Sequence, residues 1–294
     1  MKQHKLMAVL AHPDDESLGT GGILAKYASE GVQVALVTAT RGERGWFGAE
    51  EDYPGPQALG AIREKELQAA AQMLGIQQVD FLGYMDGELD LAEPAEIIAR
   101  LVEHLRRFRP QVVVTFDPFG YYGHPDHIAI AQFSTAAIVA AADPSYNPSD
   151  GATAHRVDKL YYLAPSTELQ TAYQAAFGEL SMDIDGVVRN ATPWPVWAIT
   201  TRVDTRSHWR SVWKAISCHR SQLHEYQKLL DLPKTYHHTL WGEQTFFRAL
   251  SLVNGSRNME TDLFAGLEER PVALAGEMSV LMQMKEDMQV SHER

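Results

Sequence analysis

Cysteine is nearly absent from this sequence, which holds only Cys218 among its 294 residues. A single thiol excludes an internal disulfide framework and a cysteine-rich zinc module, so any metal site must use histidine and carboxylate side chains. Positive charge is also scarce, because 26 Lys and Arg face 38 Asp and Glu, for a formal net charge of −12. That balance argues against a surface made to bind nucleic acid or anionic lipid.

Long apolar runs are missing as well. The first apolar run ends at His12 and is too short for the hydrophobic region of a secretion signal. No stretch approaches the roughly 20 apolar residues of a membrane-spanning helix. With 45% hydrophobic residues, the chain has enough apolar material for a large core. We therefore expect a globular, cytoplasmic protein without an integral membrane segment, and the sequence leaves open whether it forms a homo-oligomer.

The first half of the chain alternates short apolar segments with helical patterns. Segments typical of buried parallel strands lie at 6–11, 32–38, 79–82 and 112–116, and helical patterns at 23–28, 61–74, 94–105 and 128–142. This order predicts an α/β fold of the Rossmann-like type, a mostly parallel sheet with helices on both faces. Ligands of such sheets bind beyond the carboxyl ends of the strands.

Past residue 143 the pattern changes. Strands are expected at 159–164 and 196–203, followed by one long helix over 205–232. Trp194 and Trp197 are expected in the core rather than on a sugar-binding surface. Nothing in this half is typical of a linker, so we expect a single domain over 1–270. The Met-rich tail over 271–294 is expected to form either a terminal helix or a frayed end.

Two similar motifs follow the first and the fourth predicted strand, HPDDE starting at His12 and HPDH starting at His124. One such motif alone is better explained by helix capping, but two at the same sheet edge favour a metal site. His12, Asp15 and His127 offer two imidazoles and one carboxylate, the three-ligand set of a catalytic zinc with one open position. Iron(II) accepts the same ligands, so Fe2+ remains the alternative to Zn2+.

Asp14 and His124 of these motifs are expected beside the metal without binding it. Asp14 can take a proton from a metal-bound water, and His124 can return one to a leaving amine. Glu43 follows the second predicted strand, where it faces either substrate or solvent. The sequence thus predicts hydrolysis by an activated water molecule.

These motifs resemble those of the PIG-L/LmbE family of zinc-dependent N-acetylglucosaminide deacetylases. The likeness covers residues 6–267 and includes AHPDDE, GHPDH, TATRGERG, IREKELQAAAQMLG, HRSQ at 219–222 and ETDLFAGL. It implies an enzyme with one zinc ion per chain. Its substrate would be a small molecule, an N-acetylglucosamine-type amino sugar or conjugate that loses its acetyl group.

The resemblance also implies roles for single residues. His12, Asp15 and His127 match the zinc ligands. Asp14 matches the general base, and His124 matches the residue that protonates the amine or stabilises the oxyanion.

Five further positions receive roles only from the resemblance. Asp126 matches a residue that orients a neighbouring histidine, and Tyr122 matches one that contacts the tetrahedral oxygen in some members. Arg63 and Asp86 match positions that bind sugar hydroxyls. His219, in the HRSQ motif, is expected to form part of the wall of the site.

Two other functions stay open. The first is an amidase that cleaves a larger acyl group or a thiol conjugate with the same metal. The second is a non-catalytic protein that binds a sugar or a nucleotide, because Gly19, Gly21 and Gly22 follow the first strand. Their spacing departs from G-x-G-x-x-G, since residue 24 is Leu, and this favours close helix packing instead.

Overall fold

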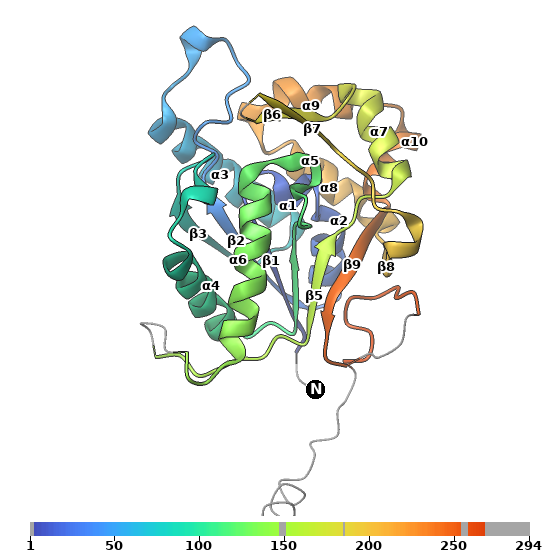
Figure 1. The fold of residues 1–294 in the computed structure, drawn as a ribbon. Helices are drawn as coiled ribbons and strands as arrows, with labels where there is room; N and C mark the ends of the chain where they lie inside the picture. Colours follow the sequence, from blue (N-terminus) through green and yellow to red (C-terminus); the bar gives the residue numbers. More distant parts are fainter. Residues whose placement is uncertain (1–2, 147–150, 185, 254–257, 268–294) are drawn as a thin grey trace, which may run out of the picture.

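The computed structural model describes residues 3–146, 151–184, 186–253 and 258–267. A seven-stranded sheet of order β3-β2-β1-β4-β5-β9-β8 lies at its centre (Figure 1). Its parallel strands are β1 (Lys5–Leu10), β2 (Gln33–Thr40), β3 (Gln78–Tyr84), β4 (Val112–Thr115) and β5 (Lys159–Leu163). The predicted α/β fold with a mostly parallel sheet is confirmed.

The second half adds antiparallel strands to this sheet. β9 (Glu243–Ser251) runs antiparallel to β5, and β8 (Thr201–Asp204) pairs with β9 at the edge. A separate hairpin joins β6 (Ser181–Ile184) to β7 (Val187–Asn190). The strand expected over 196–203 begins only at Thr201, because Val196–Ala198 forms a 3-10 turn, η3.

Helices cover both faces of the sheet, as predicted. In chain order they are α1 (Asp15–Leu18), α2 (Gly21–Ser29), α3 (Pro56–Leu74), α4 (Pro94–Phe108), α5 (Gly120–Gly123), α6 (Pro125–Ala142), α7 (Thr167–Phe177), α8 (Trp209–Ile216), α9 (Leu223–Leu230) and α10 (Lys234–Trp241). α4 and α6 pack together on one face, and α2, α3 and α8 pack together on the other. None of the helices in the described ranges is both long and apolar enough to cross a membrane.

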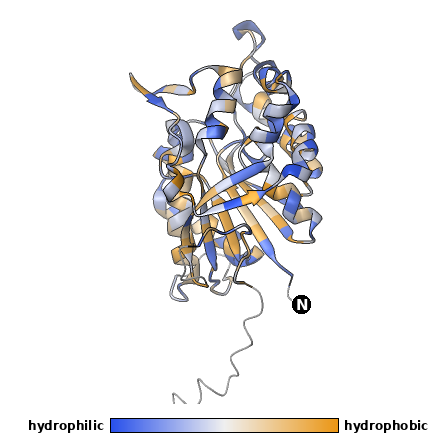
Figure 2. Ribbon diagram, turned by 90° about the vertical axis from the view of Figure 1, so that its right-hand side faces the viewer, coloured by the Kyte–Doolittle hydropathy of each residue, from blue (hydrophilic) through white to orange (hydrophobic). Residues whose placement is uncertain are grey.

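The central strands are apolar along most of their length because both of their faces are covered. Leu6 to Leu10 of β1 are at most 1% exposed, and β1 lies between β2 and β4. A strand buried on both faces reads as a continuous apolar run rather than as an alternating one. Figure 2 shows the hydrophobic residues concentrated in the strands of the sheet. This buried centre is a rigid support for the loops that leave its carboxyl edge.

The prediction of one long helix over 205–232 is wrong. The structure has two shorter helices, α8 and α9, separated by the 3-10 turn η5 (Arg220–Gln222), and a further 3-10 turn, η4 (Arg206–His208), precedes α8. His219 interrupts the helix, with φ −79° and ψ 65°. The apolar pattern continues across this break, which explains why the sequence suggests one helix.

The two expectations about domain organisation are not tested by the fold. A single domain over 1–270 stays a prediction. The tail over 271–294 lies outside the described residues.

Candidate active site

The two histidine motifs meet at the carboxyl edge of the sheet. β1 and β4 are paired neighbours, so the loops that follow them emerge side by side. The first loop leads into α1, which begins at Asp15, and the second leads through α5 into α6, which begins at Pro125. Residues that are more than a hundred positions apart along the chain are thereby brought into contact.

His12, Asp15 and His127 form a small cluster that we call the donor triangle. His12 Nδ1 lies 3.2 Å from His127 Nε2. The carboxylate of Asp15 places Oδ2 3.7 Å from His12 Nδ1 and Oδ1 3.5 Å from His127 Nε2. Donor atoms about 2.0–2.1 Å from a tetrahedral zinc ion lie about 3.4 Å from one another. The two imidazole nitrogens therefore lie at the spacing of zinc ligands, and a different oxygen of Asp15 lies next to each of them.

The outer nitrogen of each imidazole is held by the protein. His12 Nε2 lies 3.1 Å from both Asp126 Oδ2 and Asp86 Oδ1. His127 Nδ1 lies 3.2 Å from the main-chain oxygen of Gly120. Metal-binding histidines nearly always donate their second N–H to such an acceptor, which fixes the nitrogen that faces the ion. This pattern favours a metal inside the donor triangle.

Two triplets without Asp15 have one donor atom from each residue within 4.8 Å of the others, namely His12 with His124 and His127, and His12 with Asp86 and Asp126. Both include residues that support the two histidine motifs. His124 Nδ1 accepts the main-chain N–H of Asp126, and the carboxylates of the second triplet meet His12 on Nε2, the nitrogen opposite the triangle. We therefore assign these triplets to the support of the donor triangle.

Burial and neighbouring charges shift the pKa of all three donors. Burial raises the pKa of Asp15 to about 7. Burial, together with the nearby His12, holds the pKa of His127 well below its usual range. Burial also works against the charge on His12, but Asp126 and Asp86 outweigh it and raise the pKa of His12 well above its ordinary value. A cation in the triangle would favour the ionised carboxylate and the unprotonated ring nitrogens that binding needs.

Asp14 lies between His12 and Asp15 in the sequence and immediately precedes α1. Its backbone has φ 105°, an uncommon value for a residue other than glycine. Oδ2 accepts hydrogen bonds from Arg63 Nη2 at 2.8 Å and from the Tyr226 hydroxyl at 2.5 Å. This carboxylate is fixed next to a candidate metal ligand, and its role as a general base stays a prediction.

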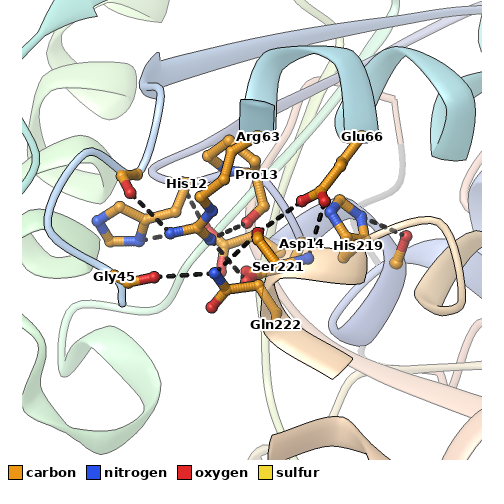
Figure 3. A network of polar contacts seen from close by, with 12 residues as sticks. His12, Pro13, Asp14, Gly45, Arg63, Glu66, His219, Ser221 and Gln222 are labelled. Carbon is orange, nitrogen blue, oxygen red and sulfur yellow. Dashed lines mark hydrogen bonds and ion pairs between the residues drawn. The ribbon is translucent and has the colours of Figure 1, made fainter. Parts of the chain in front are cut away.

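Arg63 is buried against the main chain of two loops (Figure 3). Besides Asp14, its guanidinium donates to the main-chain oxygens of Gly42 and Pro13, at 2.9 and 2.6 Å. A Cβ atom on Gly42 or on Gly45 would lie 2.2 or 2.3 Å from Arg63 Nη1. The glycines of TATRGERG are therefore needed to admit this side chain. Its binding of a sugar hydroxyl stays a prediction, because these contacts are all with the protein.

His124 and Tyr122 lie beside the donor triangle. The His124 ring stacks on His127 with centroids 4.8 Å apart and meets the edge of His12 at 4.6 Å. Burial lowers the pKa of His124 to about 4. Because Nδ1 accepts the main-chain N–H of Asp126, the ring proton belongs on Nε2. The Tyr122 ring lies 5.3 Å from that of His127, and burial raises the pKa of its hydroxyl.

Asp86 and Glu43 support the loops around His12. Asp86 Oδ2 accepts the main-chain N–H of Arg44 at 3.0 Å. Glu43 Oε2 accepts the N–H groups of Arg41 and Asp86, at 3.2 and 3.3 Å. Asp86 is 6% exposed and Glu43 is 8% exposed, so the contacts of both are mainly with the protein. Their predicted contacts with substrate stay predictions.

The expected position of His219 in the wall of the site needs correction. Its side chain is fully buried, and Nε2 lies 2.8 Å from Glu16 Oε1. Burial opposes the positive charge, but Glu16 outweighs it and raises the pKa of His219. A side chain without exposed surface cannot line a substrate pocket, and His219 instead lies against Glu16 and, at 3.4 Å, the hydroxyl of Ser17.

Sequence reasoning missed two residues of this site, Tyr226 and Glu16. Tyr226 contacts Asp14, which is 212 positions away in the sequence, and lies in a helix without a recognisable motif. Glu16 belongs to the HPDDE motif, but neither the metal site nor the proton transfer predicted from that motif uses it. In the structure its Oε2 accepts the main-chain N–H of Asp14 at 2.8 Å.

Comparison with known proteins gives the family. Residues 7–138 match the family described as PIG-L: GlcNAc-PI de-N-acetylase. The chain is 35% identical over 293 residues to the 1D-myo-inositol 2-acetamido-2-deoxy-alpha-D-glucopyranoside deacetylase of Geodermatophilus obscurus, across 90% of this chain and 98% of the relative. The chain belongs to the PIG-L family. The predicted family resemblance is confirmed.

Two other proteins are similar to this PIG-L family chain. One carries the name of a different activity, and the other has a lower sequence identity. The mycothiol S-conjugate amidase of Streptomyces coelicolor is 32% identical over 301 residues, across 91% of this chain and 98% of the relative. The N,N'-diacetylchitobiose deacetylase of Pyrococcus horikoshii is 22% identical, with a TM-score of 0.63 over 83% of each chain. The latter similarity supports the fold alone.

Proposed function

We propose that this PIG-L family chain is a metal-dependent N-deacetylase. Its substrate is N-acetylglucosamine joined to a second group, and its products are acetate and the free amino sugar. The donor triangle beside Asp14 is the observation that carries the proposal, because two imidazoles, a carboxylate and a neighbouring base are the equipment of amide hydrolysis by a metal. Relatives named as deacetylases of an acetamido sugar support the same substrate class.

His12, Asp15 and His127 would hold the metal, for which we propose Zn2+, with Fe2+ as the alternative for the same ligands. When bound, the ion would make a water molecule more acidic and polarise the acetyl carbonyl. Asp126 and Asp86 hold His12 from behind, so that Nδ1 points into the triangle.

Asp14 moves the proton in the proposed reaction. Its carboxylate accepts a proton as the water oxygen forms a bond to the acetyl carbon. It then returns this proton to the nitrogen as the C–N bond breaks, so that acetic acid and the amine leave, and the acid gives its proton to solvent to become acetate. One group can do both, because the proton lost by the water equals the proton gained by the nitrogen.

His124 and Tyr122 are proposed to stabilise the negative charge that develops on the acetyl oxygen. With its pKa lowered to about 4, His124 is neutral near pH 7 and offers the N–H of Nε2 as a hydrogen-bond donor. This favours oxyanion stabilisation over proton donation to the amine. The Tyr122 hydroxyl, which stays protonated because its pKa is raised, is the second proposed donor.

The sugar is proposed to lie against the loops that follow β2 and β3. Asp86, Arg63 and Glu43 are the polar residues there that we propose for its hydroxyl groups. These residues do not define the chemical group that is joined to the N-acetylglucosamine.

The amidase activity on a thiol conjugate is the second candidate, because one relative carries that name. The two are separated by incubating the metal-reconstituted protein with an N-acetylglucosaminyl-inositol and with an N-acylated thiol conjugate of the same sugar. We expect acetate from the first and little acid from the second. Asp14→Ala should retain its metal and lose about 100-fold or more in kcat. Full activity of this variant, or acid released only from the thiol conjugate, would overturn the proposal.

A further inference from the structure

The HRSQ motif and the turn of helix after it are not used by the proposed mechanism, although they lie against the site. His219 and Gln222 are at most 1% exposed. Figure 3 shows His219, Ser221 and Gln222 close to Asp14 and Arg63, which come from other elements of the fold. We call residues 219–226 the 219–226 segment.

Glu16 links the 219–226 segment to the main chain of Asp14. His219 Nε2 lies 2.8 Å from Glu16 Oε1, and Glu16 Oε2 accepts the N–H of Asp14 at 2.8 Å. Both His219 and Glu16 are completely buried. A buried carboxylate needs such a partner, because an unpaired charge is costly in the interior. The contact holds the N–H of Asp14 in its uncommon backbone conformation, at φ 105°.

The segment also reaches the side chain of Asp14. The hydroxyl of Tyr226, one turn into α9, donates to Oδ2 at 2.5 Å, and Arg63 donates to the same oxygen. Within the described part of the chain, Oδ1 receives no hydrogen bond. Two donors on one oxygen fix the plane of the carboxylate and leave the other oxygen to take a proton.

Further contacts bind the segment to the elements that surround Asp14. The main-chain N–H and the hydroxyl of Ser221 both donate to Glu66 of α3, at 2.8 and 2.7 Å. Gln222 Nε2 donates to the main-chain oxygen of Gly45 at 2.8 Å. α3 also carries Arg63, and Gly45 lies against that side chain. The segment therefore joins three of the elements that set the position of Asp14.

We propose that the 219–226 segment is the positioning element of the general base, in which Tyr226 fixes the carboxylate and the His219–Glu16 pair fixes the main chain. This inference rests on the proposed role of Asp14. Tyr226 and His219 are positioning residues, since they act through Asp14 and touch neither metal nor substrate. Oδ1 is the oxygen of Asp14 that accepts the proton.

The first test is Tyr226→Phe, which removes one hydroxyl, in otherwise intact metal-reconstituted protein. We expect unchanged metal content, a KM within about twofold and a kcat about 10- to 100-fold lower, because a small misplacement of a reacting group has effects of this size. Tyr27→Phe is the matched control. Tyr27 is also buried and donates to a carboxylate, that of Asp262 at 2.8 Å. We expect its kcat to stay within about twofold.

A double variant separates positioning from general destabilisation. If Tyr226 acts through Asp14, Tyr226→Phe should lower kcat in the natural protein and have no further effect in the Asp14→Ala background. An unchanged kcat in the single variant, or an equal decrease in both backgrounds, would overturn the inference. An active Asp14→Ala variant would instead overturn the proposed function, so the two failures are distinguishable.

His219 supplies an independent test. His219→Gln keeps an N–H donor near the position of Nε2, whereas His219→Ala leaves Glu16 unpaired. We expect the glutamine variant to retain at least about a third of kcat and the alanine variant to lose at least about tenfold, both with KM near that of the natural protein. Equal kcat in the two folded variants would contradict a role for this pair. If the alanine variant does not fold, the double variant above decides.

Discussion

The two halves of the chain contribute to the site in different ways. The first half supplies the donor triangle, on loops that follow the buried parallel strands β1 and β4. The second half supplies the 219–226 segment, which meets the site through hydrogen bonds to Asp14, Glu16, Glu66 and Gly45. The two halves thus divide the proposed binding of a metal from the proposed placement of a general base. Each half can be altered by variants that should leave the task of the other intact.

We expect the largest loss of metal and activity from a substitution in the first half of the chain. His127→Ala should remove one corner of the donor triangle, and with it bound metal and acetate release. Metal analysis per chain after reconstitution checks this. His224→Ala, at an exposed position in the second half, is the control and should keep its metal. Full metal occupancy in His127→Ala would exclude this residue as a ligand.

Asp126→Asn tests the support behind the triangle. The carboxylate lies 3.1 Å from His12 Nε2, and an amide would support that imidazole less well. We expect metal affinity to fall about 10- to 100-fold, as for other residues that hold a metal-binding histidine. Competition with a chelator measures this affinity. Asp90→Asn, at an exposed position, should not change it.

Gly42→Ala tests the contact between the loop after β2 and Arg63. Gly42 has φ 68°, and an added Cβ would lie 2.2 Å from Arg63 Nη1. We expect the free energy of unfolding to fall by about 2–4 kcal/mol from backbone strain and overpacking together. Gly31→Ala separates the two effects, because Gly31 also has a positive φ, 84°, but nothing lies within 4 Å. A loss for Gly31→Ala equal to that for Gly42→Ala would argue against the clash.

Ser221→Ala should weaken the attachment of the 219–226 segment to α3 and leave the first half of the chain unchanged. It removes the hydroxyl that donates to Glu66 and keeps the main-chain hydrogen bond to the same carboxylate. We expect a loss of about 1–2 kcal/mol in the free energy of unfolding, measured with denaturant, and unchanged metal content. Loss of metal from this variant would contradict the division between the two halves.

The smallest expected effect is that of Trp197→Ala. Sequence reasoning placed this residue in the core, but its side chain is 87% exposed on η3. We therefore expect the free energy of unfolding to change by less than about 0.5 kcal/mol. A loss of several kcal/mol would show that Trp197 is buried in solution. Thermal or denaturant unfolding distinguishes these outcomes.

The sequence predicts the first half of this molecule better than the second for a physical reason. The buried strands and the histidine motifs are local patterns, and the pairing of parallel strands brings the loops together. The 219–226 segment depends instead on partners far away in the sequence. Tyr226 and Asp14 are 212 positions apart, and no local pattern encodes their contact. The break at His219 was missed for the same reason, since Glu16, 203 positions away, holds the imidazole there.

The separate anchoring of the 219–226 segment has a practical consequence for anyone who purifies this protein. The donor triangle stands on strands buried from both sides, whereas the segment is joined to the site largely by polar contacts. Local opening of the 219–226 segment would release the carboxylate of Asp14 and leave the donor triangle intact. A preparation can therefore carry a full complement of metal and still be partly inactive, and titration of working sites is the better measure of its quality.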